Sequence, residues 1–118
     1  MGGKDRAKPR VTFQMALVLR VLLTDPTKAR YGLDVATSTR LPTGTIYPIL
    51  ARLEAADWVV SDWEAIDPAE EGRPRRRLYY LTGAGALQAR VALDDMRGKL
   101  DPARWQPGGV LSPGGDAV

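Results

Sequence analysis

The clearest fold signal in this chain lies in residues 41–54, which read LPTGTIYPILARLE. The first four of these residues predict a turn, and a helix is expected to follow from about residue 43 or 45 to residue 56. Pro48 falls just after the first turn of this helix, where it displaces one backbone hydrogen bond. The apolar residues have the i, i+3, i+4, i+7 spacing of an amphipathic helix: Ile46, Ile49, Leu50 and Leu53.

A shorter helix is predicted immediately before this turn, over residues 31–39. Two helices joined by about four residues have the spacing of a helix-turn-helix motif. The spacing alone is weakly specific, because many small helical domains contain two helices joined by a tight turn.

Two β-prone segments after the longer helix extend the motif. Residues 58–63 and 76–81 flank a turn-rich stretch, DPAEEG, at residues 67–72. They predict a β-hairpin whose loop is too long for a two-residue turn. A helix-turn-helix followed by such a hairpin is a winged helix.

Two outer helices are more apolar than a lone domain of about 90 residues requires. The first is predicted over residues 12–24, with Thr12 as its N-cap and only Gln14 and Arg20 as polar residues within it. The last is predicted over residues 82–100, with Thr82 as its N-cap and two apolar stripes. Burial against a second subunit accounts for both helices; for the first, the alternative is a central core helix in a monomer. The predicted dimer-interface residues are Phe13, Leu19, Leu23, Leu93, Met96 and Leu100.

The predicted fold class is therefore mainly α with a small β-hairpin (α+β), a winged helix-turn-helix followed by a C-terminal dimerisation helix. The 118 residues leave room for one domain. Residues 1–11 are predicted to be a disordered basic arm and residues 101–118 a disordered tail. Residues 12–81 are expected to form the winged helix-turn-helix, an architecture typical of DNA-binding domains, and residues 82–100 the dimerisation helix.

Basic charge is concentrated in the second half of the hairpin. The net charge is only +3, yet residues 73–77 contain four arginines. A local basic cluster on a nearly neutral body indicates a specific anionic surface, and guanidinium groups suit phosphates and a narrow minor groove. The alternative is a solubilising charged loop that Glu70 and Glu71 partly neutralise.

The face of the predicted 43–56 helix that lies opposite its apolar stripe is polar. Short hydroxyl side chains near a helix N-terminus suit phosphate contacts, and Arg52 is long enough to reach a base edge. The alternative is an ordinary solvated face. The predicted DNA-binding residues on this helix and the hairpin are Thr43, Thr45, Tyr47, Arg52, Arg73, Arg75, Arg76 and Arg77.

Composition excludes several other functions. The chain has no Cys and no His, so disulfides, the usual zinc ligand sets and His-based catalysis are ruled out. No catalytic residue, metal site or cofactor is predicted, and the chain is not expected to be an enzyme. The longest apolar run, within residues 15–23, is far shorter than the ~20 residues of a membrane span. The expected location is the cytoplasm.

Several spaced motifs resemble those of the PadR family of winged helix-turn-helix transcriptional regulators. Residues 44–48, GTIYP, match the family's Gly-Thr-(Leu/Ile)-Tyr-Pro signature, and residues 72–77, GRPRRR, with Tyr79, Leu81, Thr82 and Gly85 match its wing signature. Trp63 stands where the family has its wing tryptophan. The chain departs from the family at Asp57, where a Gly is usual; Asp tolerates the left-handed conformation that this position needs.

The resemblance implies a homodimer that is held by the first and last helices and binds a roughly palindromic operator in double-stranded DNA. It also implies repression, often relieved by a small molecule or by stress, although the sequence identifies no effector. The alternative function is a winged-helix protein-interaction module that does not bind DNA, which would favour a neutral or acidic face in place of the basic one.

Overall fold

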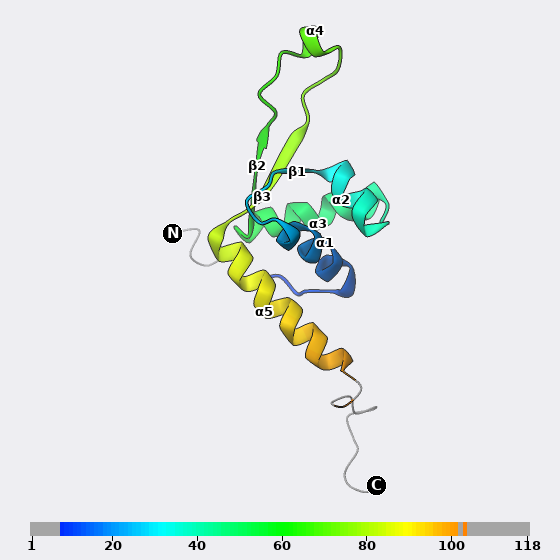
Figure 1. Cartoon of the computed structure of the whole chain (residues 1–118), viewed down its shortest axis with the longest axis vertical. Helices are drawn as coiled ribbons and strands as arrows, with labels where there is room; N and C mark the ends of the chain where they lie inside the picture. Colours follow the sequence, from blue (N-terminus) through cyan, green and yellow to red (C-terminus); the bar gives the residue numbers. More distant parts are fainter. Residues whose placement is uncertain (1–7, 102, 104–118) are drawn as a thin grey trace, which may run out of the picture.

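The computed structural model describes residues 8–101 and 103, and Figure 1 shows a group of helices from which a long hairpin projects. The elements in chain order are α1 (Phe13–Thr24), β1 (Arg30–Tyr31), α2 (Gly32–Thr39), α3 (Thr43–Ala55), β2 (Val59–Trp63), α4 (Pro68–Glu71), β3 (Arg77–Leu81) and α5 (Gly83–Leu100). The predicted fold class is confirmed: the chain is mainly helical with a small antiparallel sheet. The predicted arm and tail fall largely outside the described residues.

Hydroxyl N-caps begin both outer helices, as predicted. The Oγ1 atom of Thr12 accepts a hydrogen bond from the backbone N–H of Met15 at 3.2 Å. The Oγ1 atom of Thr82 accepts one from the N–H of Gly85 at 2.8 Å. Each cap satisfies one of the N–H groups that the first turn of a helix leaves without an internal partner.

Two left-handed residues flank α3, the second helix of the helix-turn-helix. Arg40 ends α2 with φ 62°, and α3 starts at Thr43, the earlier of the two predicted starts. Asp57 follows α3 with φ 64°, the conformation expected at the position where a Gly is usual. Pro48 lies inside α3 without ending it.

The sheet has three strands, one more than the sequence predicted. β3 lies between β1 and β2, with antiparallel pairing on both sides. β1 is only two residues long, and Tyr31 was expected to be the first residue of a helix rather than part of a strand. A strand this short has no periodicity that a sequence pattern can detect.

The core lies between α1, α3, the sheet and the start of α5. Its largest fully buried side chains come mostly from α1 and α3: Met15, Val18, Leu19, Val35, Ile46, Ile49, Leu50, Leu53 and Val59. The assignment of Leu19 to the dimer interface is wrong, because this side chain has no exposed surface within the monomer. An apolar helix pattern does not distinguish the side that faces the chain's own core from the side that faces a partner.

α5 is attached closely to the beginning of β2. A Cβ atom at Gly85 would overlap the carbonyl oxygen of Trp58, so a glycine is required there despite its low helix propensity. The Thr82 hydroxyl also donates to the carbonyl of Asp57 at 2.8 Å, and the Thr82 N–H donates to the carbonyl of Trp58 at 3.0 Å. This junction fixes the direction in which α5 leaves the sheet.

Candidate nucleic-acid interface

The predicted DNA-binding residues of α3 lie where an amphipathic helix would place them. Thr43, Tyr47 and Arg52 are exposed and Thr45 is half-buried, whereas the apolar stripe faces the core. α3 begins after Pro42 without a side-chain cap. Hydroxyl groups and backbone N–H groups therefore share the N-terminal end of α3, an arrangement that suits phosphate oxygens.

Tyr47 contributes to packing as well as to the exposed face. The residue is 43% exposed, and its ring lies against Gly32, the first residue of α2. A Cβ atom at position 32 would overlap the far end of the Tyr47 ring, so a larger residue there would displace this ring. The ring therefore contacts the start of α2, while the residue as a whole remains partly exposed.

The wing hairpin, residues 59–81, extends well beyond the helices (Figure 1). Regular strand pairing ends at the pair Trp63 and Arg77. At the tip, the sequence predicted only a turn, but residues 68–71 form the short helix α4, which Asp67 caps through a 3.0 Å bond from the N–H of Ala69. Gly72, with φ 70°, then allows the chain to return.

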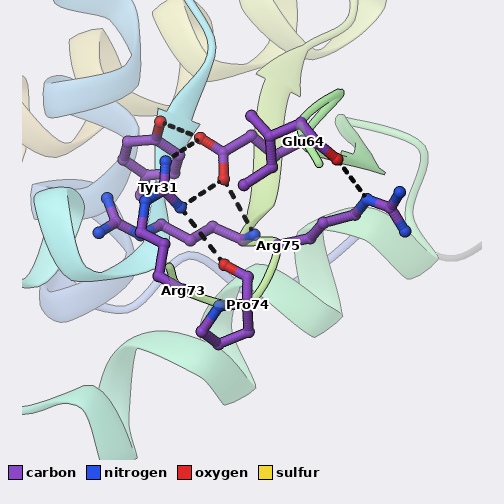
Figure 2. Close-up of polar contacts among 7 residues, drawn as sticks. Tyr31, Glu64, Arg73, Pro74 and Arg75 are labelled. Atoms are coloured by element: carbon purple, nitrogen blue, oxygen red, sulfur yellow. Dashed lines mark hydrogen bonds and ion pairs between the residues drawn. The ribbon is translucent and has the colours of Figure 1, made fainter. Parts of the chain in front are cut away.

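Arg73 is engaged by a carboxylate of the same hairpin. Its Nη1 atom lies 2.7 Å from Oε1 of Glu64 and its Nη2 atom 3.0 Å from Oε2, a two-pronged ion pair (Figure 2). The prediction of Arg73 as a DNA contact stays a prediction, although both terminal nitrogens already bind a carboxylate. The acidic partner is Glu64 and not Glu70 or Glu71, which are exposed at the tip.

Glu64 also accepts hydrogen bonds from two other parts of the chain. The Tyr31 hydroxyl donates to Oε2 at 2.7 Å, and the backbone N–H of Arg76 donates to Oε1 at 3.2 Å. The hydrogen bonds from Arg73 and then from Tyr31 lower the pKa of Glu64 from 4.5 to about 2, although burial acts in the opposite direction. The hydrogen bond to Glu64 also raises the pKa of Tyr31. We call Tyr31, Glu64, Arg73 and the N–H of Arg76 the Glu64 cluster.

The other three arginines are exposed or half-buried, and each makes a contact within the chain. Arg75 is exposed, and its Nε atom donates to the carbonyl of Ile66 at 3.0 Å. The exposed Arg76 lies over the Tyr31 ring, with Cζ 5.0 Å from the ring centroid. Arg77 is half-buried and lies 4.8 Å from the Trp63 ring centroid. These contacts restrict the three side chains, so less conformational entropy is lost when they bind an anion.

A second set of contacts links α3 to the base of the wing hairpin. The Ser61 hydroxyl donates to Oε2 of Glu54 at 2.7 Å and accepts from Nε of Arg77 at 3.0 Å. The orientation of the hairpin is thus tied to α3. No sequence pattern predicts this link, because Glu54 and Ser61 are ordinary surface residue types on two separate elements.

Most of the predicted dimer-interface residues meet in one groove between α1 and α5. The groove has a volume of about 720 Å³ and is lined by Phe13, Ala16, Leu17, Arg20, Leu93, Met96, Arg97, Leu100 and Asp101. Phe13 is 59% exposed and Leu100 63% exposed, values that are high for large apolar residues. Leu23 instead lines a neighbouring hollow with Val91 and Leu93.

Other kinds of site find no support within residues 8–101. No three acidic side chains there come together in a group that could hold a metal ion. Asp94 and Asp95 form ion pairs with Arg97 and Lys99 on the same helix. The helices of this part of the chain are too short or too polar to cross a membrane.

Comparison with known proteins identifies relatives of this chain. The family model described as the transcriptional regulator PadR-like family matches residues 18–91, which are 74 of the 118 residues. A comparison with curated proteins gives no match.

Solved structures of PadR regulators share the fold. A PadR family transcription regulator from hypervirulent Clostridium difficile R20291 is 25% identical over 73% of this chain and 88% of that chain, with a TM-score of 0.59. A PadR family transcriptional regulator from Eggerthella lenta DSM 2243 is 20% identical over 76% of this chain and 80% of that chain, with a TM-score of 0.58.

A third solved structure is longer than this chain. Disulfide-formed AbfR is 24% identical over 77% of this chain, with a TM-score of 0.58, and this chain spans 56% of its length. The family model covers the helix-turn-helix, the wing hairpin and the start of α5, the same elements that carry the motifs described above. The chain therefore belongs to the PadR-like family of transcriptional regulators, which are DNA-binding proteins and not enzymes.

Proposed function

We propose that this regulator is a repressor that binds a roughly palindromic operator in double-stranded DNA as a homodimer in the cytoplasm. The observation that carries the proposal is the combination of a polar, exposed face on α3 with three partly exposed arginines on the wing hairpin. Side chains such as Thr43 and Arg52 are of the kinds that reach base edges in the major groove. Arginines on a wing suit the neighbouring backbone and minor groove.

The groove between α1 and α5 supports a homodimer. Phe13 and Leu100 expose most of their surface at this groove, and Leu87 and Val91 are also exposed along α5. A second copy of the same groove would cover these side chains, because a two-fold axis brings identical surfaces together. The 18 residues of α5 extend over about 27 Å, long enough for an extended helix–helix contact.

A two-fold dimer would present two α3 helices to DNA. Proteins of this architecture read half-sites about one helical turn apart, so the operator would be an inverted repeat. A dimer bound at a promoter prevents the polymerase from using it, which is the simplest way for a small DNA-binding protein to repress transcription.

Selection of bound fragments from the host genome tests this proposal. The full chain is mixed with sheared genomic DNA, and the retained fragments are sequenced. We expect a shared inverted repeat that competes for binding much better than a scrambled duplex. Retention of no fragments, or of fragments in proportion to their length alone, would contradict an operator-binding repressor. The absence of any DNA binding would favour the protein-interaction module.

A further inference from the structure

Glu64 has an unusual environment for a glutamate in a projecting hairpin. It is 8% exposed, whereas the other four acidic residues of the hairpin are exposed. Burying a carboxylate costs free energy unless charged or polar groups compensate it. The Glu64 cluster supplies that compensation through one ion pair and two further hydrogen bonds.

The Glu64 cluster connects three segments that are distant in sequence. Glu64 directly follows β2, on the outgoing arm of the hairpin. Arg73 and the N–H of Arg76 belong to the returning arm, and Tyr31 belongs to β1 at the entrance to α2. One carboxylate therefore joins both arms of the hairpin to the helix-turn-helix (Figure 2).

These contacts take over where the β-ladder stops. The last regular pair is Trp63 with Arg77. Beyond it, the N–H of Glu64 donates to the carbonyl of Arg76 at 2.8 Å, and Arg75 reaches the carbonyl of Ile66 at 3.0 Å. Beyond this pair, side-chain contacts connect the two arms of the hairpin, as strand pairing connects them closer to the helices.

We propose that Glu64 is a positioning residue for DNA binding, which fixes the orientation of the wing hairpin through Arg73 and Tyr31. Arg73 serves as the structural partner of Glu64 and does not contact phosphate. The exposed Arg75 and Arg76 are then held at a fixed place relative to α3. The proposal rests on the proposed DNA-binding function.

The sign of one mutational effect separates this role from simple charge neutralisation. A carboxylate near DNA repels phosphates, so its removal strengthens binding if electrostatics alone matters. If Glu64 orients the wing, its removal releases the part of the hairpin beyond the pair Trp63 and Arg77, and the arginines there must be ordered again on binding at an entropic cost. Binding then weakens even though a negative charge has been removed.

The experiment compares Glu64→Gln, Arg73→Gln, the double variant and the wild type by fluorescence anisotropy. Each full-length chain binds the selected operator duplex at one salt concentration. The matched control is Glu70→Gln, which removes the same charge from the exposed tip of the same hairpin. Circular dichroism and thermal unfolding check that each variant is folded.

We expect Glu70→Gln to bind as tightly as the wild type or slightly tighter. Glu64→Gln and Arg73→Gln should each weaken binding by on the order of tenfold, since ordering even a few residues costs this much. The double variant should be no weaker than either single variant, because both changes disrupt the same contact. Tighter or unchanged binding by Glu64→Gln, together with weaker binding by Arg73→Gln, would overturn the proposal and make Arg73 a phosphate contact.

Limited digestion with trypsin gives a second readout that needs no DNA. Cleavage after Arg75, Arg76 and Arg77 should be faster in Glu64→Gln than in the wild type, while Glu70→Gln should match the wild type. Equal cleavage rates in all three proteins would overturn the proposal. If the wild type binds no duplex, the proposed function is refuted. If the wild type binds DNA and Glu64→Gln binds it with the same affinity, only the positioning role is refuted.

Discussion

Replacing Phe13 by Glu should separate the subunits without unfolding them. Phe13 lines the groove between α1 and α5 and is the first residue of α1. An aromatic residue has roughly 200 Å² of surface, so its 59% exposure leaves about 120 Å² uncovered in the monomer. At about 25 cal/mol per Å², covering all of it in a dimer contributes about 3 kcal/mol per subunit.

Two subunits double this contribution to about 6 kcal/mol, and covering only half of the surface still gives about 3 kcal/mol. The dimer dissociation constant of Phe13→Glu should therefore rise by about 10²- to 10⁴-fold. The monomer should remain folded, because a carboxylate is favourable in the first turn of a helix. Light scattering on a dilution series measures the mass, and circular dichroism checks the helix content.

Leu19→Ala is the control for a core position. Because Leu19 has no exposed surface, this change should lower the free energy of unfolding by about 2–5 kcal/mol and leave the association of folded chains intact. A Phe13→Glu protein that dimerises as tightly as the wild type would show that the interface lies elsewhere. A monomeric wild type at micromolar concentration would refute the homodimer itself.

Three further predictions concern the wing, α3 and pH. Changing Arg75 and Arg77 together to Ala should make the slope of log affinity against log salt shallower by about 3 to 4, since four phosphate contacts are lost per dimer; an unchanged slope in anisotropy titrations would mean that the wing does not touch the backbone. Arg52→Ala or Thr43→Ala should each cost about 1–3 kcal/mol on the operator and much less on scrambled DNA of equal length; equal losses on both duplexes would make α3 a phosphate clamp only. Because the pKa of Glu64 is lowered from 4.5 to about 2, its contribution to stability is complete above pH 4.5 and is lost as the pH falls through about 2. The unfolding temperature of the wild type should exceed that of Glu64→Gln above pH 4.5, and this difference should disappear as the pH falls to about 2. A difference in unfolding temperature that does not vary with pH would contradict the assigned contacts.

Local signals explain what the sequence could predict. Thr12 and Thr82 cap helices through bonds to the residue three positions later, so their role depends only on neighbouring residues. The apolar stripe of α3 follows from helical periodicity. The exposure of Arg52 follows from the same periodicity, because it lies off that stripe, whereas Thr43 is exposed as the first residue of α3.

Long-range contacts explain what the sequence could not predict. Glu64 bonds to Tyr31, which is 33 residues away, and to Arg73 at the far side of a hairpin loop. Nothing around Glu64 in the sequence separates it from a solvated wing residue, and an arginine cluster resembles a DNA-binding surface even where one member is engaged in an ion pair. Leu19 and Phe13 are both apolar residues of α1, and only the packed structure shows which one is inside.

The close junction between α5 and the sheet has a consequence for the spacing of the two DNA half-sites, because a small change in the angle of α5 produces a large displacement at its far end. If two subunits join through α5, the helix is the arm that sets how far apart the two α3 helices lie. A rotation of 10° at the junction would move the far end of an arm of about 27 Å by about 5 Å, more than the rise of one base pair. The close approach of Gly85 to the Trp58 carbonyl and the bonds of Thr82 to Asp57 and Trp58 oppose such a rotation. The dimer should therefore measure the distance between its half-sites strictly, so that an operator lengthened by one base pair is a different and poorer ligand.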